Sequence, residues 1–370
     1  MMKIVYKVVV VSLITLGVSI LVGAFIYKPA KLLPWSYVSD QMHMKLEYYK
    51  AHQTKYNTLF IGSSVVRRGF NPEIFDALVD SSIDVHSYNF GINWMGSPEN
   101  IFLVDNLALN NNDNLKYVFI ELSKLKVIDY SNMHTARAIY WYNWKNYSFA
   151  IKAVMGSSSA LHIKGSAVLS HTICYAENLL NIGYISEVNN FEKRDAMVQD
   201  SVKKSGDNFN GFAGLEGTVK ADTEINAEEN VQAGLIKFLN DTSGLTRRKI
   251  ASANAFDAIE KNPELIRNYN KPYLEWIDEV IATLMAENIY PIFVISPKAD
   301  KRQYDELLPV FFNINPKHRI NIADSRKYPE LYSVAFAGDE THLNKKGAAR
   351  YSQILAHDFS MIIGEFRGKK

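Results

Sequence analysis

Residues 57–70 read NTLFIGSSVVRRGF and combine a short apolar run, a polar break and the start of a second apolar pattern. The run at 58–61 lies between polar residues, which predicts a buried strand. Gly62 ends this strand, and residues 65–70 begin a helix. A serine at such a turn lies where backbone N–H groups converge, and these donors suit a nucleophile that attacks a carbonyl. A plain turn with a helix N-cap is the alternative interpretation.

The segments that follow repeat this alternation of buried strand and helix. Helices are expected at 71–79, 98–109, 270–287, 304–312 and 347–363, and strands at 83–90, 116–122, 290–296 and 319–323. This order predicts an α/β fold with a parallel sheet and helices on both faces. Ligands bind such sheets at the carboxyl ends of the strands. Ser64 follows the first strand and Gly91 the second, so both are expected at that edge.

A second chemical pattern lies near the C-terminus, where residues 338–344 read GDETHLN. An aspartate three residues before a histidine can curl back and bond one ring nitrogen, leaving the other nitrogen to act as a base. Asp339 and His342 have this spacing. Asp339 is therefore a candidate for the acid that orients the His342 ring.

The strand–Gly–x–Ser turn, the Asp-x-x-His pair and the following Leu-Asn resemble the SGNH (GDSL-like) hydrolase superfamily. The resemblance covers about 57–122 and 290–359, and it implies a flavodoxin-like three-layer sandwich with a mostly parallel sheet. Where well-known members read Gly-Asp-Ser, this chain reads Gly62-Ser63-Ser64, so Ser64 matches the nucleophile and Ser63 the spacer. The resemblance implies a catalytic triad of Ser64, His342 and Asp339.

The same resemblance implies an oxyanion hole built from the backbone N–H groups of Ser64 and Gly91. Members of the family usually carry an asparagine after the third strand, whereas residues 120–123 read IELS here. Asn93 or Ser123 is then expected to complete the hole, or the hole has only two members. Arg68 and Lys298 are candidates for substrate contacts.

The N-terminus contains twenty consecutive uncharged residues, VVVVSLITLGVSILVGAFIY, at 8–27. That is about the ~20 residues a helix needs to cross a bilayer, and it exceeds the ~7–15 apolar residues of a cleavable signal peptide. Lysines flank both ends. We expect a single-pass signal anchor in the membrane, with the large remaining part periplasmic or extracellular.

Four parts of the chain follow from these assignments: 1–34 as membrane anchor and linker, 35–130 and 271–370 as the two parts of the SGNH domain, and 131–270 as a large, mostly helical insertion or cap. The aromatic residues at 140–147 are either a stacking surface for a sugar or acyl chain, or ordinary packing. Residues 191–217 are expected to be loop. His134, His162 and His171 lack metal-ligand spacing and are expected to be structural.

Composition excludes several classes of protein. A net charge of +2 over 370 residues gives no reason to expect a nucleic-acid partner. Cys174 is the only cysteine, so an intrachain disulfide is impossible and a thiolate metal site is not expected. No nucleotide motif is present. We therefore expect neither a cofactor nor a metal.

A membrane-anchored SGNH domain with a central insertion resembles the D-alanyl-transfer protein of teichoic acid synthesis and the acetylation proteins of exopolysaccharides such as alginate. This implies O-acyl transfer or ester hydrolysis on a cell-envelope glycan through an acyl-serine, beside a membrane-bound O-acyltransferase. A lipid esterase or lysophospholipase, a non-catalytic scaffold subunit, and an unrelated α/β domain with Ser64 distant from His342 are the alternatives.

Overall fold

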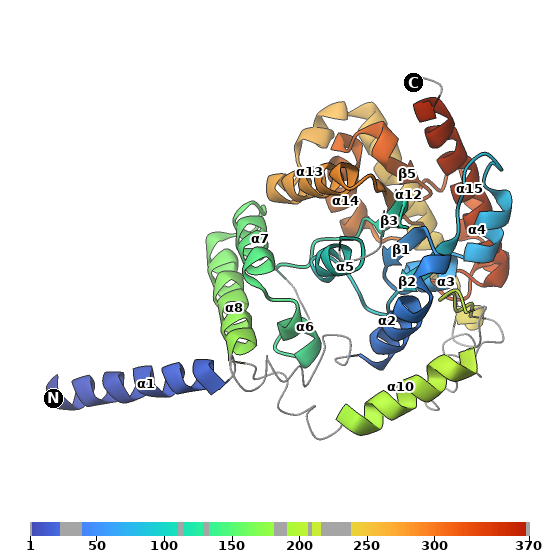
Figure 1. Ribbon diagram of the computed structural model, residues 1–370. Helices are drawn as coiled ribbons and strands as arrows, with labels where there is room; N and C mark the ends of the chain where they lie inside the picture. The colour runs from blue at the N-terminus through green and yellow to red at the C-terminus, as the bar shows by residue number, and fades with distance from the viewer. Residues whose placement is uncertain are drawn as a thin grey trace. The chain divides into compact units, whose positions relative to one another are not determined.

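The computed structural model describes residues 2–22, 39–109, 114–128, 133–180, 191–205, 209–215 and 238–367 (Figure 1). The chain divides into two compact units. The first consists of Met1–Glu47 and Val127–Val202, and the second consists of Tyr48–Lys126 and Lys203–Lys370. The predicted boundary of the insertion differs from this division, because residues 203–270 belong to the second unit.

The second unit is built on a five-stranded parallel sheet. Its strands are β1 (Thr58–Gly62), β2 (Ser87–Gly91), β3 (Tyr117–Glu121), β4 (Tyr290–Ile295) and β5 (Arg319–Asn321), in the order β2-β1-β3-β4-β5. Every residue of β1 to β4 is buried. Parallel strands covered on both faces read as continuous apolar runs for this reason. The predicted α/β class with a parallel sheet is confirmed.

Helices cover both faces of this sheet (Figure 1). They are α3 (Ser64–Gly69), α4 (Pro72–Leu78), α5 (Glu99–Leu107), α12 (Ser243–Lys261), α13 (Lys271–Ala286), α14 (Lys301–Asn313) and α15 (Lys345–Arg367). On one face, the ring of Phe119 makes edge-to-face contacts with Phe75 of α4 and Phe359 of α15. On the other face, Trp276 of α13 meets Phe293 edge-on. The arrangement is a three-layer α/β sandwich.

One predicted strand begins later than expected. β2 starts at Ser87, whereas the alternating pattern predicted a strand from residue 83. Ile83 and Val85 are buried in the core that α4 and α15 share, although they lie outside any strand. Their burial produced the alternation that the sequence shows.

The described part of the first unit is helical. It contains α1 (Met2–Val22), α6 (Ala136–Tyr140), α7 (Trp144–Met155), α8 (Leu161–Leu179) and α10 (Phe191–Ser205), and α2 (Asp40–His52) continues from it into the second unit. The loop predicted from residue 191 is wrong over α10. Of the aromatic cluster, Trp141 and Tyr142 are stacked and buried, as packing predicts, while Trp144 is 67% exposed.

Among the helices in the described ranges, none has the length and apolar character needed to cross a membrane. The predicted membrane segment at 8–27 extends into residues outside the described ranges, and the predicted linker at 29–34 lies entirely outside them.

Candidate active site

The turn after β1 places Ser64 at the start of α3. Gly62 permits the turn, because a Cβ there would lie 2.2 Å from Val66 Cγ2 and 2.8 Å from Glu121 Cβ. Ser63 caps α3, since its Oγ accepts a hydrogen bond from the Val65 N–H at 3.1 Å. The Ser63 N–H donates to Glu121 Oε2 at 2.5 Å. The turn is thus fixed at both ends, with Ser64 partly exposed between them.

The structure brings Ser64, His342 and Asp339 into one hydrogen-bonded chain. Ser64 Oγ lies 2.8 Å from His342 Nε2, and His342 Nδ1 lies 2.7 Å from Asp339 Oδ2. Because Nδ1 faces a carboxylate, the ring proton belongs on Nδ1, which leaves Nε2 to accept the serine proton. The alternative in which Ser64 and His342 are distant in space is therefore excluded.

The carboxylate of Asp339 is held by its own loop. Its Oδ1 accepts hydrogen bonds from the Thr341 N–H at 2.6 Å and the His342 N–H at 2.7 Å. Burial alone would raise the pKa of Asp339, but the hydrogen bonds and charge interaction with His342 outweigh burial and hold that pKa well below its ordinary value. The acid therefore stays ionised across the neutral range.

Asn344 ties this loop to α15. Its Nδ2 donates to the carbonyls of Ala335 and Ala337 at 3.0 and 3.2 Å, and its Oδ1 accepts from the Gly347 N–H at 2.9 Å. The Gly338 N–H donates to His342 O at 2.9 Å and closes the turn. The asparagine that follows the histidine in the sequence therefore has a structural role, which is to hold this loop against the start of α15.

Lys298, in the loop after β4, lies beside the same turn. Its Nζ donates to His342 O at 2.5 Å and to Asp339 O at 3.3 Å, and the residue is 2% exposed. Burial lowers the pKa of the Lys298 ammonium to about 7, against an opposing effect of Asp339. The expected substrate contact by Lys298 finds no support here, because its nitrogen binds the backbone that carries the histidine and the acid.

Gly91 lies against α3, where a Cβ would approach Arg67 N to 2.3 Å, so the position requires glycine. Its N–H donates to Asn89 Oδ1 at 2.8 Å. That bond competes with the expected role of this N–H as an oxyanion donor.

The other two candidate donors differ from each other. Asn93 Oδ1 accepts from Arg67 Nη1 at 3.2 Å, which turns the amide oxygen toward the arginine. Ser123 Oγ accepts from the Ser97 N–H at 2.9 Å, in a network with the hydroxyl of Tyr273. Asn93 is therefore the better candidate for completing an oxyanion hole.

Glu121 is a residue that sequence reasoning passed over. It ends β3 and is 8% exposed. Burial raises the pKa of its carboxyl, while hydrogen bonds from Ser63 oppose that shift. The sequence indicated this residue only through its place, as a charged residue at the end of the apolar run 117–120.

Residues 209–215 are bonded to the elements that carry the site, which the sequence did not predict. The Asn89 N–H donates to Asn210 O at 2.9 Å, and the Ala213 N–H donates to Arg67 O at 3.1 Å. Arg68 Nη1 donates to Ala213 O at 3.2 Å, so this candidate for a substrate contact is tied to the segment. These bonds attach the segment to β2 and α3.

Comparison with protein-family models, with curated proteins and with solved structures found no match. The interpretation of the site therefore rests on its own geometry.

Proposed function

We propose that this chain is an SGNH-type serine esterase or O-acyltransferase that acts on acyl esters of a cell-envelope glycan. The observation that carries the proposal is the hydrogen-bonded chain Ser64–His342–Asp339 at the carboxyl edge of a parallel sheet. The strand order is that of a flavodoxin-like sheet, in which this edge binds ligands. The partial exposure of His342 and Asp339, 23% and 35% of their side chains, leaves the site open to a substrate.

The proposed reaction has two acyl-transfer steps. His342 Nε2 takes the proton of Ser64 Oγ as the oxygen attacks the ester carbonyl, and Asp339 stabilises the imidazolium. The same Nε2 then gives its proton to the departing alcohol, which leaves an acyl-serine. Water or an acceptor hydroxyl attacks the acyl group next, with His342 again removing the proton, and Ser64 is regenerated.

The oxyanion of each tetrahedral intermediate requires hydrogen-bond donors. We assign this role to the backbone N–H of Ser64 and the side-chain amide of Asn93. Arg67 binds the amide oxygen of Asn93, so the donor function belongs to Nδ2. Gly91 is the weaker candidate, because Asn89 accepts from its N–H.

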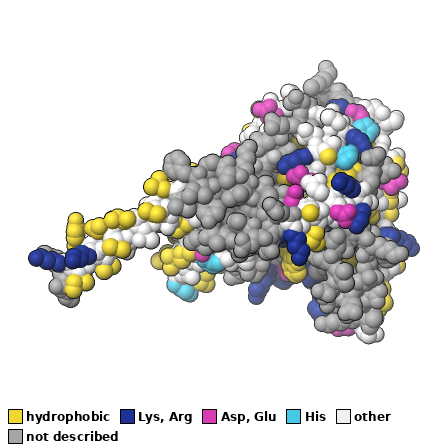
Figure 2. Space-filling model, turned by 60° about the horizontal axis from the view of Figure 1, so that its bottom comes forward, with side chains coloured by type: hydrophobic (Ala, Val, Ile, Leu, Met, Phe, Trp, Pro, Cys, Tyr) yellow, Lys and Arg dark blue, Asp and Glu magenta, His cyan; other side chains and the backbone are white. Residues whose placement is uncertain are grey.

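The N-terminal residues support the cell-envelope part of the proposal. α1 exposes a run of apolar side chains, among them Val8, Leu13 and Leu21, with basic side chains near its N-terminal end (Figure 2). We propose that the segment 8–27 is a single-pass anchor and that the sheet unit works outside the cytoplasm, beside a membrane-bound O-acyltransferase. Retention in membranes after an alkaline wash tests the anchor, and release of the full chain would contradict it.

The activity is tested with full-length protein and p-nitrophenyl acetate, followed by intact-mass analysis for an acyl-serine. We expect acylation in the wild type and none in Ser64→Ala. Ser82→Ala, an exposed serine before β2, is the matched control. A trapped acyl-enzyme with slow release would favour a transferase, and rapid release an esterase. Absence of any acylation would favour a scaffold, while a preference for long-chain esters would favour a lipid substrate.

A further inference from the structure

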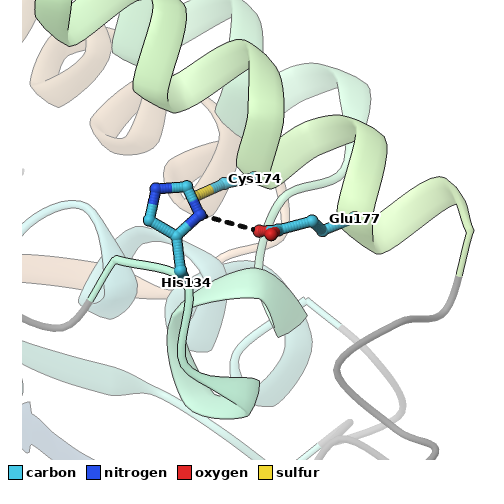
Figure 3. Close-up of side chains that lie close together, drawn as sticks. All are labelled: His134, Cys174 and Glu177. Atoms are coloured by element: carbon cyan, nitrogen blue, oxygen red, sulfur yellow. Dashed lines mark hydrogen bonds and ion pairs between the residues drawn. The ribbon is translucent and has the colours of Figure 1, made fainter.

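Three side chains of the first unit lie close together outside the proposed active site, and each offers one atom that could bind a metal ion (Figure 3). Cys174 and Glu177 lie three residues apart on α8 and therefore on one face of that helix. His134 lies just before α6, which packs on α8. His134 Nδ1 is 3.0 Å from Glu177 Oε2 and 3.7 Å from Cys174 Sγ, and all three ligand atoms lie within 4.8 Å of one another.

We propose that His134, Cys174 and Glu177 bind a zinc-class divalent metal ion, with water in a fourth position. Tetrahedral zinc with the usual bond lengths separates its ligand atoms by about 3.3–3.8 Å. The distances from His134 Nδ1 to the other two ligand atoms are already close to this range. The carboxylate of Glu177 closes the remaining distance by rotating, which its partial exposure of 22% allows.

The ligand set selects the class of metal. A thiolate, an imidazole nitrogen and one carboxylate oxygen suit zinc and its neighbours, whereas calcium and magnesium prefer all-oxygen sites. Three protein ligands leave one position for water, and the 43% exposure of His134 opens that position to solvent.

Proton balance is simple for this site. Before metal binds, the buried Cys174 is a thiol that carries its proton. When the metal binds the sulfur, the thiol proton is displaced and passes to solvent. The His134–Glu177 hydrogen bond is also exchanged, since Nδ1 must offer its lone pair and keep its proton on Nε2.

Surrounding residues hold the sulfur in place. The hydroxyl of Tyr142 hydrogen-bonds to His171 Nδ1 at 2.6 Å and also interacts with Cys174. The other nitrogen of His171 bonds to Val127 O at 2.7 Å. Outer residues of this kind commonly fix the ligands of a metal site. The sequence did not indicate this cluster because His134 and Cys174 are 40 residues apart.

The experiment uses full-length, untagged protein that has been stripped with a chelator and is then titrated with Co²⁺ and with Zn²⁺. We expect a sulfur-to-cobalt charge-transfer band and the strong visible absorption of tetrahedral cobalt, both removed by Zn²⁺. Cys174→Ser should lose the charge-transfer band. Each of Cys174→Ser, His134→Ala and Glu177→Gln should weaken zinc binding by at least about tenfold.

His162→Ala is the matched control, because His162 is an exposed histidine of the same helix. It should bind Zn²⁺ like the wild type. Unfolding temperatures in chelator establish that each variant folds, and Zn²⁺ should raise the temperature of the wild type only when all three ligands are present. A cobalt spectrum without a thiolate band, or equal zinc affinity in the wild type and the three variants, would overturn the proposal.

Discussion

The two three-residue clusters of this protein differ in what holds them together. Asp339 of the proposed triad accepts hydrogen bonds from its own loop, and Lys298 binds two carbonyls of that loop. His134 contacts both Cys174 and Glu177, and the hydroxyl of Tyr142 also interacts with Cys174. Backbone hydrogen bonds orient the first cluster, whereas in our proposal a bound metal ion joins Cys174 to Glu177 in the second. Pre-organisation by backbone bonds is what distinguishes the two.

The largest effect should come from breaking the triad itself. Ser64→Ala or His342→Ala should each lower the turnover of p-nitrophenyl acetate by at least about 1000-fold. The double variant should be no worse than either single variant, because the two residues act as one unit. Steady-state rates check this, and losses that multiply in the double variant would show that Ser64 and His342 act independently.

The next effect concerns the oxyanion. Asn93→Ala should lower kcat by about 100- to 1000-fold while KM changes little, since the missing donor acts on charge that develops in the transition state. Asn106→Ala, an asparagine of α5 that bonds its own helix, should behave like the wild type. If kcat is unchanged in Asn93→Ala, the N–H of Gly91 becomes the better candidate for the oxyanion donor.

Lys298 tests whether the backbone of the loop is what pre-organises the triad. Lys298→Met keeps the length of the side chain but leaves the carbonyls of Asp339 and His342 without this donor. We expect kcat to fall by about 10- to 100-fold at unchanged KM, as for a misplaced catalytic group. Lys301→Met, an exposed lysine of α14, is the control. A raised KM at unchanged kcat would instead support substrate contact by Lys298.

The same lysine gives a pH dependence of stability. Its pKa is lowered from 10.5 to about 7 in the folded protein. Between these values the unfolded chain binds more protons, so the free energy of unfolding should rise with pH. Relative to Lys298→Met, the wild type should therefore gain free energy of unfolding as the pH rises from about 7 to about 10. Urea unfolding measures it, and a difference independent of pH would contradict the lowered pKa.

The sequence predicted the parts of the fold that depend on near neighbours. Three buried, mostly apolar runs became β1, β3 and β4, and the edge strand expected at 319–323 became the shorter β5, of which only Ile320 is buried. Asp339 and His342 were found together because they lie three positions apart in one loop. The role of Lys298 was missed, since its partners lie 41 and 44 positions away.

The helix α10 was missed for a different reason. Its residues are mostly charged and polar, and such a segment resembles a solvated loop unless its helix formers are weighed. The proposed metal-ligand cluster was missed because its histidine lies 40 residues from the cysteine. A single cysteine also gave no motif.

The smallest effect tests whether residues 209–215 belong to the sheet unit. Gly211 has φ +80°, and a Cβ there would lie 2.1 Å from Asn89 O, so Gly211→Ala should push the segment off β2. We expect a loss of about 1–3 kcal/mol in the free energy of unfolding and, at most, about a tenfold loss of activity, since Arg67 and Arg68 of α3 would lose their bonds to Ala213. Gly165→Ala, where nothing lies within 4 Å of the added Cβ, is the matched control. Urea unfolding and steady-state rates measure both variants. Unchanged stability in Gly211→Ala would show that the bonds of this segment to β2 and α3 do not stabilise the second unit.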